Sequence, residues 1–325
     1  MTSTAPAHAR RMLARRSLLV AAAGGALAAC ASGGRDSGST GRLVTLDGAT
    51  AALALLLGPH QVGTAAFLAV DPLLQAIEQI QATAVADVSG AGGGIDVERL
   101  AALRPDRLVG FRSADTEPVL AGLAALHAVE RTGDHEADCR ALAAGMRADA
   151  SNLLDDVHRR TTELAARLRT GSPPTVSVLS PGLDGQSLYL LGAGTPAGTV
   201  VGALGLPRPA AQRGLTDPAT PFVPVSAERI GEHDADLVLL LTGPTADPTF
   251  LRDQPLWQRL GAVRDGRVVE VDAIRWATMS CALGTLWVLD DLSAVLLGEG
   301  TVVTGAASPA GLGRLRDYRA RYVPG

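Results

Sequence analysis

Three arginines and two aromatic residues stand where loops follow predicted strands or helices, and together they could bind an anionic ligand. They are Phe67, Arg112, Arg213, Arg275 and Trp276. The planar guanidinium of arginine pairs with carboxylate and phenolate-type oxygens, and an aromatic ring offers an apolar face with little entropy to lose. In open α/β sheets, ligands bind beyond the carboxyl ends of the strands. We therefore predict ligand contacts from these five residues, although a single arginine on a loop is more often solvated and a single aromatic residue more often part of a core.

No pattern in the sequence favours catalysis or direct metal binding. The best metal cluster, His135-Glu136-Asp138-Cys139, stands at the start of a predicted helix, where such residues commonly serve as caps. The glycine-rich segment Gly90–Gly94 lacks the lysine and hydroxyl residue of a phosphate-binding loop. A Gly-x-Ser-x-Gly nucleophile elbow is also missing from the sequence. We therefore expect no enzyme, no covalent cofactor and no metal ligands.

The first 29 residues have the composition of an export signal. Four arginines and no acid precede the apolar run Leu18–Ala29, which is too short for a spanning helix of about 20 residues. This run ends in Leu27-Ala28-Ala29-Cys30, which resembles the bacterial lipobox and predicts lipidation at Cys30. The segment beginning Arg15-Arg16 is similar to a twin-arginine signal, but ordinary secretory signals also start with arginines, so both export routes stay open. We predict a lipoprotein held on the outer face of the cell membrane by its lipid anchor only.

The net charge argues against one class of partner, and the positions of the cysteines argue against a disulfide. Removal of residues 1–29 leaves 25 arginines against 33 acidic residues, a net charge of about −8, which disfavours nucleic acid as a partner. Residues 31–40 are small and polar, as in a flexible tether. Because Cys139 and Cys281 fall in different predicted lobes, we expect two buried free thiols and no disulfide between them.

From residue 42 the chain alternates short β-branched runs with longer amphipathic stretches, the pattern of an α/β fold. The predicted strands of the first half are Leu43–Leu46, Val62–Phe67, Val85–Val88, Leu108–Phe111 and Val129–Thr132. Those of the second half are Val176–Leu179, Leu188–Leu191, Phe222–Val225, Leu237–Leu241 and Val268–Val271. Between the two sets, Glu136–Thr170 has apolar residues at helical spacing and predicts one long helix, which Gly171-Ser172-Pro173-Pro174 ends.

One sequence unit occurs in both halves. Glu98-Arg99 and Glu228-Arg229 each follow a potential capping Asp or Ser by two residues. Eight positions after each glutamate, Asp106 and Asp236 precede an apolar strand. This repetition predicts two similar α/β lobes joined by one long helix, with a ligand cleft between them. A helical connector allows only modest closure, since bending it would break backbone hydrogen bonds.

The order and spacing of several motifs resemble the Fe/B12 periplasmic-binding domain, the helical-backbone (class III) substrate-binding proteins of ABC transporters. The resemblance covers nearly all of residues 41–298. Its motifs are the opening strand Leu43–Asp47, Leu57–Gly63, the Glu98 and Glu228 segments, Leu204-Gly205, Pro255–Val268, Val271-Asp272 followed by Arg275-Trp276, and the helix near Leu286–Leu297. It implies a protein that captures a ferric siderophore, haem or cobalamin and delivers it to an ABC permease dimer.

The resemblance also implies roles for single residues. Glu98 and Glu228 would dock on arginines of the two permease subunits, one glutamate per lobe. Taken alone, a glutamate in the first turn of a helix is better explained by the helix dipole, but its occurrence at equivalent places in both copies of the repeated unit favours docking. Aromatic residues are scarce, and Tyr189 is the only tyrosine before the tail, which puts aromatic packing of a large catecholate and tyrosinate ligation of haem iron in doubt.

These inferences give one domain plan and two alternatives. We predict a signal peptide at 1–29, a lipidated tether at 30–40, an N-terminal lobe at 41–147, a connecting helix at 148–170 and a C-terminal lobe with tail at 171–325, in a monomeric iron-siderophore binding protein. The first alternative is a direct zinc or manganese uptake lipoprotein, which needs several converging histidine or carboxylate ligands. The second is a lipoprotein that uses the same fold without transport.

Overall fold

The structure is a computed structural model that describes residues 41–65, 71–90, 94–113, 117–279 and 281–323. Its first sheet contains five strands in the order β3-β2-β1-β4-β5, all parallel. The bounds are Leu43–Thr45 (β1), Gln61–Thr64 (β2), Ala86–Asp87 (β3), Arg107–Phe111 (β4) and Ala125–Val129 (β5). Because these strands are parallel, their carboxyl ends meet along one edge of the sheet.

The second sheet contains five strands in the order β10-β9-β6-β7-β8. The bounds are Val176–Pro181 (β6), Leu188–Leu191 (β7), Phe222–Val225 (β8), Leu237–Thr242 (β9) and Val268–Asp272 (β10). Read from its other end, this order repeats that of the first sheet strand for strand. The one difference is β7, which runs antiparallel to both of its neighbours. The two sheets confirm the predicted pair of similar α/β lobes.

The repeated sequence unit has the same structural use in both lobes. Asp106 accepts a hydrogen bond from the backbone N–H of Arg42 at 2.7 Å, immediately before β1. Asp236 accepts one from the backbone N–H of Thr175 at 2.9 Å, immediately before β6. Each aspartate therefore ties the strand that follows it to the first strand of its own sheet. The helices before them differ, since α3 (Val97–Ala102) is α-helical and capped by Asp96, whereas the 3-10 helix η3 (Ala227–His233) receives no side-chain cap from Ser226.

The remaining helices pack around the two sheets. In the first lobe they are α1 (Gly48–Leu57), α2 (Leu73–Gln81), α4 (Glu117–Ala121) and α5 (His135–Gly145). In the rest of the chain they are α6 (Ser151–Arg169), α7 (Pro196–Ala203), η2 (Ala210–Gln212), α8 (Thr249–Arg252), α9 (Pro255–Gln258), α10 (Gly261–Arg264), the π-helical turn η4 (Ile274–Thr278), α11 (Ala282–Leu297) and α12 (Pro309–Tyr322). No helix in the described ranges combines the length and the apolar character that crossing a membrane requires.

The single helix predicted over Glu136–Thr170 is wrong, because the chain forms two helices there, α5 and α6. Arg147 adopts a left-handed backbone conformation with φ of 57°. The N–H of Ala148 then bonds the carbonyl of Ala143 at 2.9 Å, and that of Arg147 bonds Ala144 at 3.0 Å. This pair of bonds is a Schellman motif, which normally has glycine at the left-handed position. Since arginine stands there instead, the sequence carried no stop signal.

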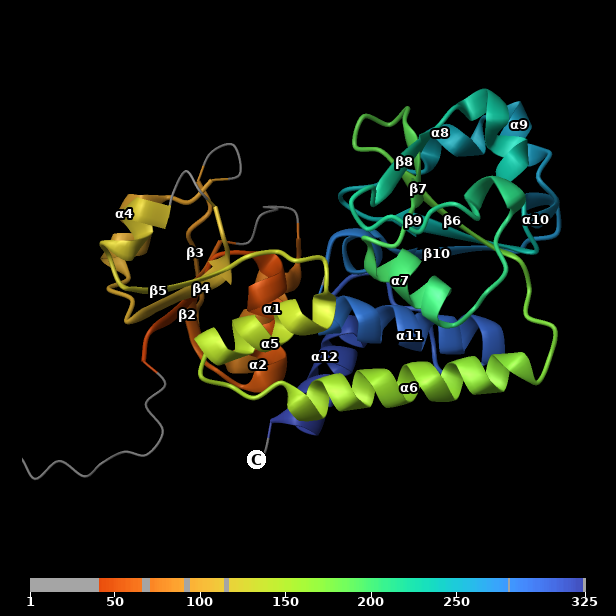
Figure 1. The fold of residues 1–325 in the computed structure, drawn as a ribbon. Coiled ribbons are helices and arrows are strands. Elements are labelled where there is room, and N and C mark those ends of the chain that lie inside the picture. Colours follow the sequence, from red (N-terminus) through yellow and green to blue (C-terminus); the bar gives the residue numbers. More distant parts are fainter. Residues whose placement is uncertain (1–40, 66–70, 91–93, 114–116, 280, 324–325) are drawn as a thin grey trace, which may run out of the picture. The chain divides into compact units, whose positions relative to one another are not determined.

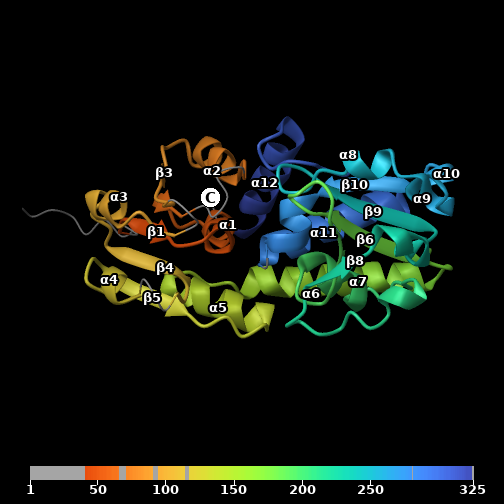
Figure 2. The same ribbon diagram turned by 90° about the horizontal axis from the view of Figure 1, so that it is seen from above.

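Helix α6 lies alongside α11 in both views (Figures 1 and 2). Arg167 on α6 makes a bidentate ion pair with Glu299, with both N–O distances at 2.7 Å, and Arg160 pairs with Asp290 of α11. The C-terminal helix α12 packs against α1 of the first lobe, where Arg319 donates to the carbonyl of Leu55 at 2.8 Å. The last described helix therefore packs against the first lobe.

Candidate ligand-binding cavity

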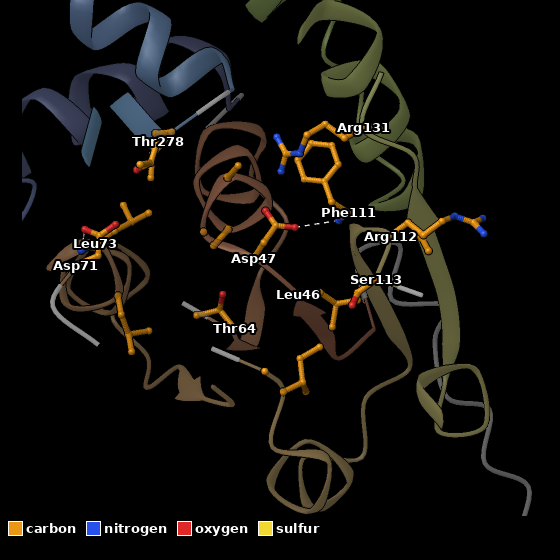
Figure 3. A pocket seen from close by; sticks show the side chains of 18 of the residues that line it. Leu46, Asp47, Thr64, Asp71, Leu73, Phe111, Arg112, Ser113, Arg131 and Thr278 are labelled. Carbon is orange, nitrogen blue, oxygen red and sulfur yellow. Dashed lines mark hydrogen bonds between the residues drawn. The ribbon is translucent and has the colours of Figure 1, made fainter. Parts of the chain in front are cut away.

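A cavity of about 590 Å³ opens at the carboxyl ends of the parallel strands β1, β2 and β4 (Figure 3). Its volume lies in the range of small-molecule sites. Apolar side chains form much of its wall: Leu46, Leu73, Leu74, Ile77, Ile95, Phe111, Leu120 and Leu126, with Ile274 and Met279 from the second half of the chain. The predicted cleft therefore exists, but first-lobe residues provide most of its lining.

Asp47 fixes the geometry of the cavity floor. It follows β1, caps α1 and also reaches the end of β4. One carboxylate oxygen accepts from the backbone N–H of Thr50 at 2.8 Å, and the other accepts from the Thr50 hydroxyl at 2.8 Å and the backbone N–H of Phe111 at 2.9 Å (Figure 3). The carboxylate of Asp47 is thus occupied by hydrogen bonds within the protein and is not free for a ligand.

Phe111 and Arg131 form a cationic platform in the cavity wall. The guanidinium carbon of Arg131 lies 3.7 Å from the centroid of the Phe111 ring, within cation–π distance (Figure 3). Among the described residues, no carboxylate lies within ion-pair distance of Arg131. The sequence prediction missed Arg131, because it extended the fifth strand over Val129–Thr132. The structure ends β5 at Val129, so Arg131 lies just beyond a strand end, where ligand contacts are expected.

Arg112 lines the same cavity but is already paired. Its guanidinium lies 3.2 Å from Glu117 and 3.3 Å from Glu130, and its side chain is half-exposed. In Figure 3 this guanidinium points away from Asp47, whereas that of Arg131 lies against the Phe111 ring. Arg112 therefore contributes a partly neutralised charge to the rim of the cavity.

A buried ion pair closes the opposite side of the cavity. Asp71, just before α2, lines the cavity and accepts from Nη2 of Arg275 in η4 at 2.7 Å. The exposed fractions of the two side chains are 8% and 0%. Burial raises the pKa of Asp71, while the Arg275 charge acts in the opposite direction. Arg275 is thus absent from the described lining, whereas its partner Asp71 is part of it.

The other predicted contact residues lie elsewhere. Trp276 is fully buried, donates from its indole to Asp291 at 2.9 Å and does not line the cavity, because η4 turns Arg275 and Trp276 into the core while Thr278 reaches the cavity. Arg213 is exposed after η2 and is also absent from the described lining. Phe67 and Cys30 lie outside the described residues. Of the five predicted contacts, the structure therefore places Arg112 in the cavity and Arg275 behind it.

Glu98 and Glu228 are both exposed and occupy the first turns of α3 and η3. Each helix precedes the strand that pairs with the first strand of its sheet, β4 in one lobe and β9 in the other. The two glutamates are therefore equivalent in the repeated architecture.

Histidines and cysteines form no metal cluster in the described ranges, where no three His, Cys, Asp or Glu side chains converge. Cys139 and Cys281 are free and buried, as predicted. Cys139 lies in α5 of the first lobe and Cys281 lies just before α11, yet the two thiols are close enough to interact: burial, and after it the nearby Cys139, raise the pKa of Cys281 to about 12. Burial likewise raises the pKa of Cys139 to about 11. Neither thiol has the character of a metal ligand or nucleophile.

Comparison with known proteins identifies the family. The sequence matches the family described as periplasmic binding protein over residues 43–274. It is 27% identical over 212 residues to the achromobactin-binding periplasmic protein of Dickeya dadantii (strain 3937), covering 61% of this chain and 68% of that protein.

Solved structures share the fold. Staphylococcus aureus SirA complexed with staphyloferrin B has a TM-score of 0.61 at 20% identity, covering 78% of this chain and 92% of that one. A siderophore periplasmic binding protein from the fuscachelin gene cluster of Thermobifida fusca has a TM-score of 0.60 at 22% identity, covering 80% and 98%. With two α/β sheets, a cavity at strand ends and a match over most of its length, this chain belongs to the periplasmic binding protein family.

Proposed function

We propose that this protein captures an anionic iron chelate of the ferric siderophore kind outside the cytoplasm and delivers it to an ABC permease. The observation that carries the proposal is the Arg131–Phe111 platform in the cavity. Because no described carboxylate pairs with Arg131, its charge is available to a ligand oxygen. The ring beneath it holds the guanidinium in place and limits the entropy lost on binding.

The relatives support a siderophore over haem or cobalamin. The Dickeya dadantii relative is named for achromobactin, and SirA was solved with staphyloferrin B. The described lining also contains neither histidine nor tyrosine, two residues that commonly ligate haem iron, although Met279 is present. We therefore rank haem below an anionic siderophore as the cargo.

The direct test is a binding titration of the purified protein with ferric siderophores of different charge, haem and cobalamin, followed by visible absorption and tryptophan fluorescence. An anionic ferric siderophore should bind stoichiometrically. Arg131→Gln should weaken that binding about 10- to 100-fold, as expected for the loss of a hydrogen bond to a charged group. Arg259→Gln, which removes an exposed arginine after α9, is the matched control and should change nothing. Equal affinities of the wild-type and Arg131→Gln proteins would contradict the proposed site.

Delivery to the permease is proposed to use Glu98 and Glu228. Both carboxylates are exposed and occur once per lobe at equivalent positions, so a two-subunit permease could take one contact from each. The double variant Glu98→Ala/Glu228→Ala should keep ligand affinity and lose uptake in cells. Glu163→Ala/Glu299→Ala removes two exposed acids beside the α6–α11 pair and should leave uptake intact. Unchanged uptake in the first double variant would exclude this docking surface.

The membrane anchor is proposed at Cys30. The lipobox-like sequence Leu27-Ala28-Ala29-Cys30 supports it. Labelling cells with a palmitate analogue should mark the wild-type protein and not Cys30→Ser. Labelling of the variant to the same extent would place the lipid elsewhere.

A further inference from the structure

The ion pair between Asp71 and Arg275 joins the two halves of the chain beside the cavity. Asp71 precedes α2 in the first lobe, and Arg275 lies in the π-helical turn η4 between β10 and α11. Several ion pairs of the described residues join the two halves of the chain. In this pair alone among them, both side chains are less than one-tenth exposed. In Figure 3, Asp71 and Thr278 lie on one side of the cavity, and Phe111 and Arg131 lie on the other.

Arg275 is incompletely satisfied in this arrangement. Its Nη2 donates to Asp71, and its Nη1 lies 3.6 Å from Asp272, too far for a hydrogen bond. Within the described structure, Nε and Nη1 are buried without any acceptor. A buried guanidinium with unused donors is costly unless a further acceptor reaches it. Asp272 is itself engaged by the backbone N–H groups of Arg275 at 3.0 Å and Gly305 at 2.7 Å, so it is not free to move closer.

Asp71 is the partner of Arg275 that belongs to the cavity wall. Asp71 is among the described residues that line the cavity, whereas Arg275 is not. The Asp71 carboxylate also accepts from the backbone N–H of Leu73 at 2.9 Å at the start of α2. Withdrawal of Asp71 would therefore leave Nη2 of Arg275 without its carboxylate partner and remove a hydrogen bond from the first turn of α2.

We propose that Asp71 holds Arg275 in the ligand-free protein as an internal substitute for a ligand carboxylate, and that an anionic chelate exchanges for Asp71 on Arg275. The exchange lets the Nε and Nη1 donors of Arg275, which have no acceptor while Asp71 is bound, donate to oxygens of the ligand. It also breaks the buried link between α2 and η4, so ligand capture changes how the halves are joined. This inference rests on the proposed function, and it adds that the cavity recognises carboxylate oxygens on both of its sides.

The test uses citrate as the probe, because it carries three carboxylates, with affinity measured by isothermal titration calorimetry. Asp71→Asn removes the competing charge at nearly constant volume and should bind citrate about tenfold more tightly than the wild-type protein, as expected for one released charge-assisted contact. Arg275→Gln should bind citrate more weakly than the wild-type protein, and adding Asp71→Asn to it should restore little. Glu299→Gln, which removes an exposed carboxylate from Arg167, is the control and should match the wild-type protein. Equal or weaker citrate binding by folded Asp71→Asn would overturn the exchange.

A second measurement needs no variant. In the wild-type protein, saturating citrate should speed amide hydrogen exchange at residues 73–77 of α2, because Asp71 leaves Arg275. Slower exchange there would contradict the proposal even if Asp71→Asn failed to fold. The proposed function is judged separately by Arg131→Gln. Loss of binding in Arg131→Gln with no gain in Asp71→Asn would leave that function standing and reject the exchange, whereas failure of the wild-type protein to bind any anionic chelate would reject the function itself.

Discussion

Replacing Asp47 by alanine should destabilise the first lobe and the ligand cavity together. The carboxylate of Asp47 caps α1 through Thr50 and also binds the backbone N–H of Phe111. Loss of an N-cap costs about 1 kcal/mol. Loss of a hydrogen bond to a charged acceptor costs about 1.5–3 kcal/mol. Because one side chain makes both contacts, we expect Asp47→Ala to lower the free energy of unfolding by about 3 kcal/mol.

The assay is urea unfolding followed by circular dichroism, with the free energy extrapolated to water. Thr50→Val is the matched control, since it removes only the hydroxyl contact of Asp47 from a fully buried position, and it should cost about 1.5 kcal/mol, half of the loss expected for Asp47→Ala. Asp47→Ala should also weaken siderophore binding, because Phe111 supports the guanidinium of Arg131. A loss of stability below about 0.5 kcal/mol, the size of an ordinary surface substitution, would refute the assignment of Asp47 as the link between α1 and β4.

Three further outcomes are expected. Gly284→Ala should unfold at a lower urea concentration than the wild-type protein, because an added Cβ would overlap the backbone carbonyl oxygens of Met279 and Arg275. An unchanged unfolding midpoint would contradict this packing. Burial raises the pKa of Asp291 to about 6, so the native protein binds a proton more readily than the unfolded chain. The wild-type protein should therefore gain about 2 kcal/mol relative to Asp291→Asn as the pH falls from 7 to 4, measured by urea unfolding, and a relative loss would reverse the sign. Iodoacetamide at pH 8 should leave Cys139 and Cys281 unmodified in the native protein and modify both in urea, as peptide mass spectrometry would show; native labelling would disprove their burial.

The sequence predicted the strands well because their physical signals are local. Runs such as Val176–Leu179 and Leu237–Leu241 are β-branched or leucine-rich, and breakers bound them, so each was found close to its observed position. The fifth strand was displaced because Ala125–Val129 contains few strand-forming residues and forms the edge of its sheet. That displacement hid Arg131, since a residue predicted inside a strand is not expected among the ligand contacts at a strand end.

Side-chain direction was the part that the sequence could not supply. Arg275 and Trp276 follow a strand end, as a ligand contact should, but a π-helical turn directs both into the core. The Schellman motif at Arg147 was equally hidden, because tertiary packing stabilises a left-handed arginine where glycine is usual. Pairings such as Asp71 with Arg275 join residues about two hundred positions apart and depend on the finished fold.

The return of α12 to the first lobe has a consequence for synthesis. Seven consecutive residues of α1, Thr50–Leu56, are buried, and part of their cover comes from residues 309–322. When the ribosome has completed the strands of the first sheet, it has therefore not yet made α12, the helix that covers part of α1. We therefore expect α1 to stay partly uncovered during synthesis, a state that favours aggregation, until residues 309–322 have been made. The packing of this lobe can accordingly be completed only after the C-terminal helix has been made.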